Sequence, residues 1–220
     1  MADMVDSDLM EKLAQLRATH CARLPTPEMA VLSRATARLR RSGILQRCLQ
    51  PGETVPNFDF GDADDGPGTL YDLLQQRPVV VKFFRGFWCP FCKTESEAYE
   101  DIRGELEALG CHFFAVTPGR IPPGQAHLRV IHDEDNRIAR RFGVAYELSA
   151  DEIDLLVGWG LEVDQVNTSG KWEIPLPATY LVNTDRTVAW QFVDADFRER
   201  CCPDELIDEA QQCCCQATPP

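Results

Sequence analysis

The 220-residue sequence lacks any long run of apolar residues. The longest such stretches span only a few positions, as in Pro78–Val81, whereas a helix that crosses a bilayer needs about 20. We therefore expect no membrane partner. The first residues, Met1–Asp6, are acidic and lack both the basic start and the apolar block of a secretory signal, so a cytoplasmic location is the default expectation.

Positive charge is also scarce. Lys and Arg total 22 against 35 Asp and Glu, which gives a formal net charge of −13. Nucleic acids and anionic membrane surfaces are bound through clustered positive charge, so we expect neither as a partner. Hydrophobic residues make up 44% of the chain, which is enough to bury a core. The length fits one domain with an added arm, or two small domains.

Cysteine, in contrast, is abundant, with 10 residues. Without a secretory signal, a structural disulfide framework is the less favoured interpretation. Reactive thiols, metal ligands and inert residues all remain open. One pair has Cys-x-x-Cys spacing, and five more cysteines crowd the C-terminal end, where they form either an exposed tail or an alternative resolving group: Cys201, Cys202, Cys213, Cys214 and Cys215.

Residues 1–48 are predicted to form a helical arm. Leu9, Leu13 and Leu16 recur at helical spacing, and a second helix is expected to start with Thr26 as its N-cap and to stop near Gly43. The arm either packs on the main domain or contacts a second chain, so a homodimer is one possibility. We assign residues 49–215 to the main domain and 216–220 to a tail.

From residue 55 onward, strand patterns and helix patterns alternate. This order predicts an α/β protein with a mixed sheet and helices on both faces. Residues 61–68 are expected to form an acidic, glycine-rich loop. The expected strands cover 57–60, 78–84, 112–117 and 128–132, with a hairpin of 178–182 and 187–193, and the expected helices cover 69–74, 90–109, 136–142, 150–159 and 203–212.

The most informative segment contains Cys89 and Cys92. Cys89 lies where a predicted buried strand gives way to a long helix, and Cys92 lies one turn further along the same face. Unsatisfied N–H groups and the helix dipole favour a thiolate at Cys89, and Arg85 adds positive charge nearby. We expect Cys89 to attack and Cys92 to resolve.

The same pair is also compatible with two other interpretations, a buried structural pair and half of a zinc site. A four-ligand zinc site needs a second cysteine pair, and the remaining clusters lie far along the chain. The redox interpretation is favoured, and it requires no metal or organic cofactor.

The segment Trp88–Cys92 at a strand-to-helix junction resembles the thioredoxin superfamily. The wider pattern resembles the peroxiredoxin-like branch of the alkyl hydroperoxide reductase/thiol-specific antioxidant family. This resemblance implies a thioredoxin-like, peroxiredoxin-type fold that reduces peroxides or disulfides at the expense of a thioredoxin-like or low-molecular-weight thiol donor. The matching stretches, in the family's order, are residues 51–58, 79–92, 131–133 with 139–144, and 176–182 with 193–196.

The resemblance also implies roles for single residues. Cys89 falls at the family's attacking cysteine, and Pro177 falls where the superfamily has a cis-proline beside it. Trp88 is expected to cover the site and to bind a partner surface. Lys82 and Gly86 occupy the positions of the family's upstream proline and its threonine, and the candidates for its late arginine are Arg198 and Arg200.

Three functions follow as hypotheses. The leading one is a thiol-dependent peroxidase that uses Cys89 and Cys92. The second is a protein disulfide reductase with little peroxidase activity, which Gly86 in place of the threonine suggests. The third is a non-catalytic thioredoxin-fold binding module that uses the arm as its interface.

Overall fold

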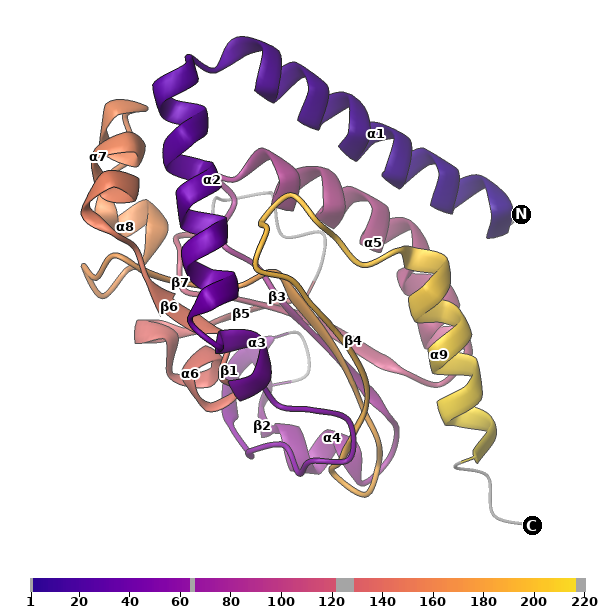
Figure 1. Cartoon of the computed structure of the whole chain (residues 1–220). Coiled ribbons are helices and arrows are strands. Elements are labelled where there is room, and N and C mark those ends of the chain that lie inside the picture. Colours follow the sequence, from indigo (N-terminus) through magenta and orange to yellow (C-terminus); the bar gives the residue numbers. More distant parts are fainter. Residues whose placement is uncertain (1, 64–65, 122–128, 217–220) are drawn as a thin grey trace.

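A five-stranded mixed sheet forms the centre of the computed structural model, which describes residues 2–63, 66–121 and 129–216 (Figure 1). The three strands β5, β4 and β3 run parallel, while β8 is antiparallel to both β3 and β9. The predicted mixed sheet is therefore confirmed. Across the sheet the strands are β5 (Val130–His132), β4 (His112–Thr117), β3 (Val79–Phe83), β8 (Ala178–Val182) and β9 (Val188–Val193).

One face of the sheet is covered by α5 (Pro90–Ala108) and α9 (Pro203–Gln216). The N-terminal helix α1 (Ala2–Arg23) lies across both of them (Figure 1). Leu9 and Leu13 of α1 are buried there in one apolar cluster with residues of α5 and α9. Because these helices share a core, the first half of the arm packs on the main domain.

The opposite face carries the remaining elements. It includes two small antiparallel strand pairs, β1 (Asp59–Ala63) with β2 (Gly66–Thr69) and β6 (Ala145–Glu147) with β7 (Glu173–Pro175). The helices are α2 (Thr26–Arg41), α3 (Ile44–Arg47), α4 (Leu70–Leu74), the 3-10 turn η1 (Glu134–Asn136), α6 (Arg137–Arg141), α7 (Ala150–Gly158) and α8 (Val163–Val166).

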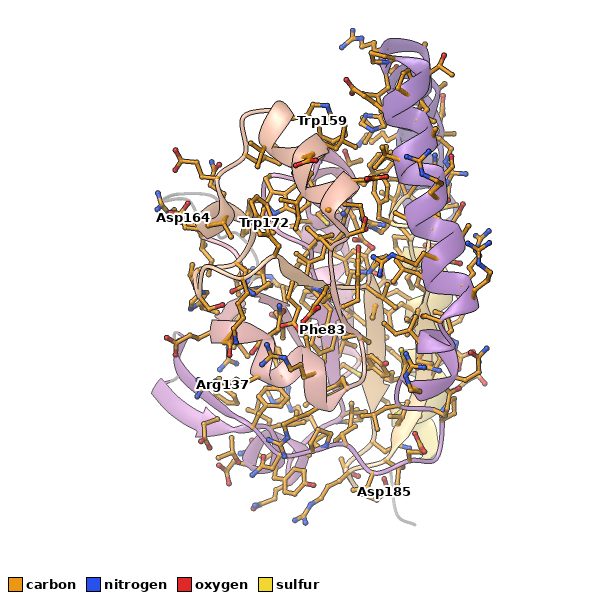
Figure 2. All side chains as sticks on the ribbon, turned by 60° about the vertical axis from the view of Figure 1, so that its left-hand side comes forward. Phe83, Arg137, Trp159, Asp164, Trp172 and Asp185 are labelled. Atoms are coloured by element: carbon orange, nitrogen blue, oxygen red, sulfur yellow. The ribbon has the colours of Figure 1, made fainter. Side chains whose placement is uncertain are left out.

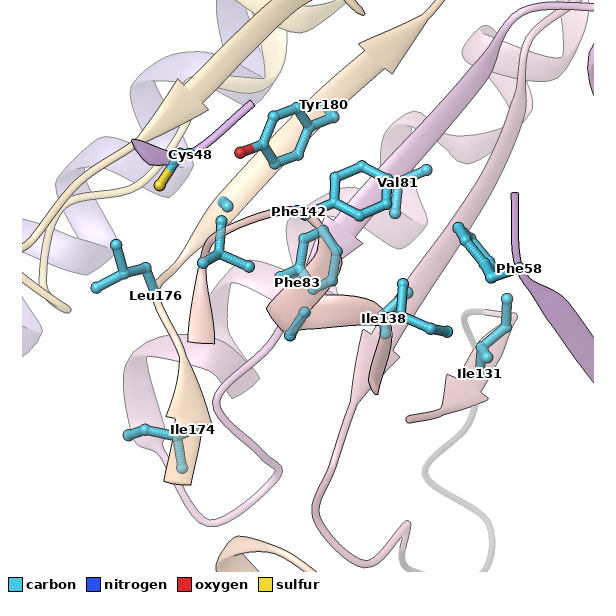
Figure 3. Close-up of a cluster of buried hydrophobic side chains, with 14 of the residues drawn as sticks. Cys48, Phe58, Val81, Phe83, Ile131, Ile138, Phe142, Ile174, Leu176 and Tyr180 are labelled. Atoms are coloured by element: carbon cyan, nitrogen blue, oxygen red, sulfur yellow. The ribbon is translucent and has the colours of Figure 1, made fainter. Parts of the chain in front are cut away.

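The side chains of β3 alternate between the two faces, as the pleat of a strand requires. Val81 and Phe83 point into the larger apolar cluster, where Phe83 contacts Phe142 and Tyr180 (Figure 3). In the whole molecule, Phe83 lies in the interior (Figure 2). Lys82 points to the opposite face, toward α5, and places a charge in the interior between sheet and helix.

Some local predictions were wrong. The expected loop at residues 61–68 belongs largely to the β1–β2 hairpin, apart from residues 64–65, which lie outside the described residues. In this hairpin Gly68 opposes Phe60, and the Phe60 ring lies 3.0 Å from where a Cβ at position 68 would stand. Pro25, and not Thr26, is the N-cap of α2. In the described part of the chain, no helix is long and apolar enough to span a membrane.

Candidate active site

Cys89 is the N-cap residue of α5, at the point where the chain turns from the sheet into the helix. Its N–H donates to the carbonyl oxygen of Gly86 (3.2 Å), and its carbonyl oxygen accepts from the N–H of Lys93 (3.1 Å). Pro90 occupies the first turn, where its missing N–H costs no helical hydrogen bond. This geometry puts the Cys89 sulfur at the positive end of the helix dipole.

A guanidinium group contacts each sulfur of the pair. Arg85 donates from Nη1 to the Sγ of Cys89 (3.9 Å), and Arg200 donates from Nη2 to the Sγ of Cys92 (3.4 Å). All four side chains are buried. Of the two late arginines, Arg200 is the one brought to the cysteines, whereas Arg198 pairs with the carboxylate of Asp196.

A chain of buried charges lies beneath the sulfurs. Arg200 Nε is 2.8 Å from Glu95 Oε2, and Lys82 Nζ is 2.5 Å from Glu95 Oε1. Lys82 also donates to the Thr179 hydroxyl on β8 (2.9 Å). The side chains of all three charged residues are at most 1% exposed, so their interactions are little screened by solvent. Lys82 is therefore a paired charge in the interior.

The surroundings make the two thiols unequal. Burial opposes a charge on Cys89, but a hydrogen bond from Cys92 and the charges of Arg85 and Arg200 outweigh it and lower the Cys89 pKa to about 5. For Cys92, burial together with the hydrogen bond to Cys89 and the negative charge there raises the pKa well above its ordinary value. A thiolate at Cys89 beside a neutral thiol at Cys92 is therefore the favoured state near neutral pH.

The Cys89 sulfur is enclosed, since its side chain is only 1% exposed. Arg85 lies between two aromatic rings, with its guanidinium carbon 5.0 Å from the Trp88 ring centre and 4.4 Å from that of Phe197. Trp88 itself is half-buried. A substrate can reach Cys89 only after part of this cover moves.

Trp88 also accounts for the glycine at position 86. Gly86 has φ +140°, a region that side chains other than glycine rarely adopt. A Cβ built there would lie 2.6 Å from Cδ1 of Trp88. The indole therefore occupies the space that a threonine would need in this loop.

Pro177 lies at the same end of the sheet. It is buried and directly precedes β8, whose first residue, Ala178, pairs with Phe83 at the end of β3. The cis geometry that the resemblance implies at this position is not found: every peptide bond of the described residues, including the one before Pro177, is trans.

Sequence reasoning missed two residues of this site, Glu95 and Phe197. A signal for Glu95 was present, because it lies on the apolar stripe of α5 four residues after Phe91, and an acidic residue there needs a buried cation as partner. Phe197 gave no such signal, since it lies in a segment between β9 and α9 that has no regular pattern.

Two further features bear on the zinc-site interpretation and on the tail cysteines as an alternative resolving group. Over residues 2–63, 66–121 and 129–216, no group of three or more His, Cys, Asp or Glu side chains is arranged to hold a metal ion. Cys213 and Cys214 lie near Cys111, just beyond the C-terminal end of α5. They are therefore too far away to resolve Cys89 within one chain, because a helix of 19 residues is about 28 Å long.

The sheet order, the flanking helices and a Cys-x-x-Cys pair at a strand-to-helix junction define a thioredoxin-like fold of the peroxiredoxin type. The sequence pattern of the AhpC/TSA family matches residues 51–191, which is more than half of the chain. The protein belongs to the AhpC/TSA family.

Solved structures agree with this fold. Peroxidoxin BcpB from Mycobacterium tuberculosis is 19% identical, with a TM-score of 0.56 over 78% of this chain and 99% of that one. The mitochondrial 2-Cys peroxiredoxin of Plasmodium falciparum is 13% identical, with a TM-score of 0.54 over 74% and 93% of the chains. AhpC of Mycobacterium tuberculosis is 17% identical, with a TM-score of 0.53 over 77% and 94%. No curated protein sequence matches significantly.

Proposed function

We propose that this protein is a thiol-dependent peroxidase in which Cys89 attacks the peroxide and Cys92 resolves the product. The observation that carries the proposal is the buried pair of sulfurs, each in contact with an arginine, which gives Cys89 the lower pKa. Family membership supports a thiol peroxidase or a thioredoxin-like oxidoreductase as the class of enzyme.

The reaction balances in three steps. The Cys89 thiolate attacks one peroxide oxygen, the O–O bond breaks, and the other oxygen leaves as an alcohol or water after taking a proton. The Cys92 thiol then displaces hydroxide from the Cys89 sulfenic acid, which forms a disulfide and releases water. Two equivalents of a thiol donor, either a thioredoxin-like protein or a low-molecular-weight thiol, reduce that disulfide by exchange.

Arg85 has a defined task in the first step. Charge develops on the departing oxygen, and donors already aimed at that region stabilise it. Arg85 Nε and Trp88 Nε1 are buried donors without a hydrogen-bond partner in the structure, and their side chains lie against each other beside Cys89. In our proposal these two groups bind the peroxide, while Pro177 lines the same end of the sheet.

A second candidate function is disulfide reduction with little peroxidase activity. The observation that favours it is the indole of Trp88 over Gly86, which removes the space for the family's peroxide-binding threonine. In this case Cys89 would attack a substrate disulfide and Cys92 would release the product by a second exchange.

Stopped-flow measurement of hydroperoxide consumption, followed by reduction of insulin disulfides, separates the two functions. We expect rapid peroxide consumption by the wild type, loss of it in Cys89→Ser, and retention in Cys213→Ser, because a serine at 213 keeps the hydrogen bond to Asn183. Equally slow consumption by all three proteins contradicts the peroxidase proposal, and insulin reduction by the wild type would then favour the reductase.

A further inference from the structure

A second pair of thiols lies at the far end of α5. Cys111 follows the helix and leads into β4, and its Sγ is 3.4 Å from the Sγ of Cys214 in the last turn of α9. The two residues are 103 positions apart in the sequence, so this contact depends on the tertiary fold. Figure 1 shows α9 beside α5 on the same side of the sheet.

Cys111 is held in a fixed position. Its N–H donates to the carbonyl oxygen of Leu106 (2.9 Å), and its side chain is 1% exposed in the apolar cluster shared by α5 and α9. Cys214 is partly exposed and lies where the hydrogen-bond ladder of α9 ends, so it can shift with little loss of structure. A disulfide bond is about 2.05 Å long, so its formation needs an approach of about 1.4 Å.

The neighbouring Cys213 points elsewhere. Its thiol donates to Oδ1 of Asn183, in the turn between β8 and β9, at 2.8 Å. Consecutive residues of a helix are about 100° apart around its axis, which explains why two adjacent cysteines reach different partners. The geometry therefore selects Cys214, and not Cys213, as the partner of Cys111.

We propose that Cys111 and Cys214 are a second redox-active dithiol, distinct from Cys89 and Cys92, whose oxidation joins the end of α9 to the start of β4. The oxidant is a low-molecular-weight disulfide. The more exposed Cys214 attacks one of its sulfurs as a thiolate, forms a mixed disulfide and releases one thiol. The Cys111 thiol then loses its proton, attacks the Cys214 sulfur and releases the second thiol, so one disulfide is reduced for each one formed.

This disulfide would restrain α9, the helix that follows the segment carrying Arg200 into the proposed peroxidase site. Arg200, which contacts Cys92, lies three residues before α9 begins at Pro203. A link at the other end of α9 ties this helix covalently to the sheet. It also closes a long loop in the unfolded chain and so stabilises the folded state.

The test is disulfide mapping of the wild-type chain after treatment with oxidised glutathione. Cleavage after Arg and Glu separates Cys111, in residues 108–120, from the C-terminal cysteines in residues 210–220. We expect these two peptides to be linked in the wild type and in Cys213→Ser, and unlinked in Cys214→Ser. We also expect oxidation to raise Tm more in the wild type than in Cys214→Ser.

Two results would overturn the proposal. One is glutathione retained on Cys214 while Cys111 stays reduced, and the other is a link that persists in Cys214→Ser. Because the mapping reads Cys89 and Cys92 in a separate peptide and needs no peroxide, its outcome is independent of the peroxidase proposal.

Discussion

The two ends of α5 place thiols in opposite electrostatic settings. At the N-terminal end, Cys89 has the helix dipole and two arginines beside it, and its pKa is lowered. At the C-terminal end, burial raises the pKa of Cys111, and the hydrogen bond to Cys214 and the charges of Cys214 and Cys213 raise it further. The comparison shows that burial favours the neutral thiol at both ends, and that only the hydrogen bond and the cations beside Cys89 reverse this effect.

The largest expected effect is on the rate of peroxide consumption, which we expect to depend on the cysteine at the N-terminal end of α5 and not on the one at its C-terminal end. Cys89→Ser should lower the rate of peroxide consumption by on the order of 10³-fold, because the attacking atom is lost. Cys111→Ser should change that rate little, since Cys111 lies at the other end of the helix. Stopped-flow kinetics on both variants measure this. A comparable loss in Cys111→Ser would remove the distinction between the two ends.

Glu95→Gln is expected to have the largest effect on stability. It leaves Lys82 and Arg200 buried without their shared carboxylate, which should cost about 3 kcal/mol of the free energy of unfolding. Glu97→Gln is the matched control, because Glu97 is exposed on the same helix and should change stability by less than about 0.5 kcal/mol. Urea denaturation of both variants provides the test, and equal midpoints would show that the charge chain contributes nothing.

Gly86→Thr tests whether the indole of Trp88 fills the space beside position 86, near the N-terminal end of α5. The new side chain meets the indole of Trp88 and strains the backbone, so we expect a loss of about 2 kcal/mol. In a Trp88→Ala background the steric part of that loss should disappear, which a double-mutant cycle on thermal unfolding would show as a coupling energy. Strictly additive effects would mean that the indole and position 86 do not compete for space.

Sequence reasoning predicted the fold, which the structure confirms, and it placed Cys89 at the strand-to-helix junction, because both depend on local signals. The strand before Cys89, Pro90 in the first helical turn and the cation at Arg85 are all visible within a few residues. The position of Glu95 on the apolar stripe of α5 signalled a buried cation, but the identity of its partners, Lys82 and Arg200, depends on how α5 packs on the sheet. The cis geometry at Pro177 came from the family resemblance and from no local signal, and the bond is trans. The hairpin at residues 59–69 was missed because its acidic, glycine-rich composition favoured a loop.

Arg85→Gln should have the smallest of these effects. It should change the reactivity of Cys89 at the N-terminal end of α5 and leave that of Cys111 at the other end unchanged. Without this cation the Cys89 thiolate is less favoured. A rise of about one unit in the Cys89 pKa lowers the thiolate fraction at pH 6 by about half, so alkylation of Cys89 at pH 6 should slow about twofold. Alkylation of Cys111 and the rate in the control Arg103→Gln should not change, because Arg103 is exposed on the surface of α5. Mass spectrometry of peptides after timed iodoacetamide exposure resolves the sites. An unchanged Cys89 rate would assign the lowered pKa to other groups.

The most direct test of the account is the pH dependence of Cys89 alkylation in a Cys92→Ser variant, whose hydroxyl can still donate to the Cys89 sulfur. Iodoacetamide reacts with the thiolate, so the rate follows the fraction of Cys89 that is deprotonated. A lowered pKa predicts a midpoint well below pH 7 and a nearly constant rate between pH 7 and 9. A midpoint near the ordinary thiol value of about 8.5 would contradict the central claim that the arginines hold Cys89 as a thiolate.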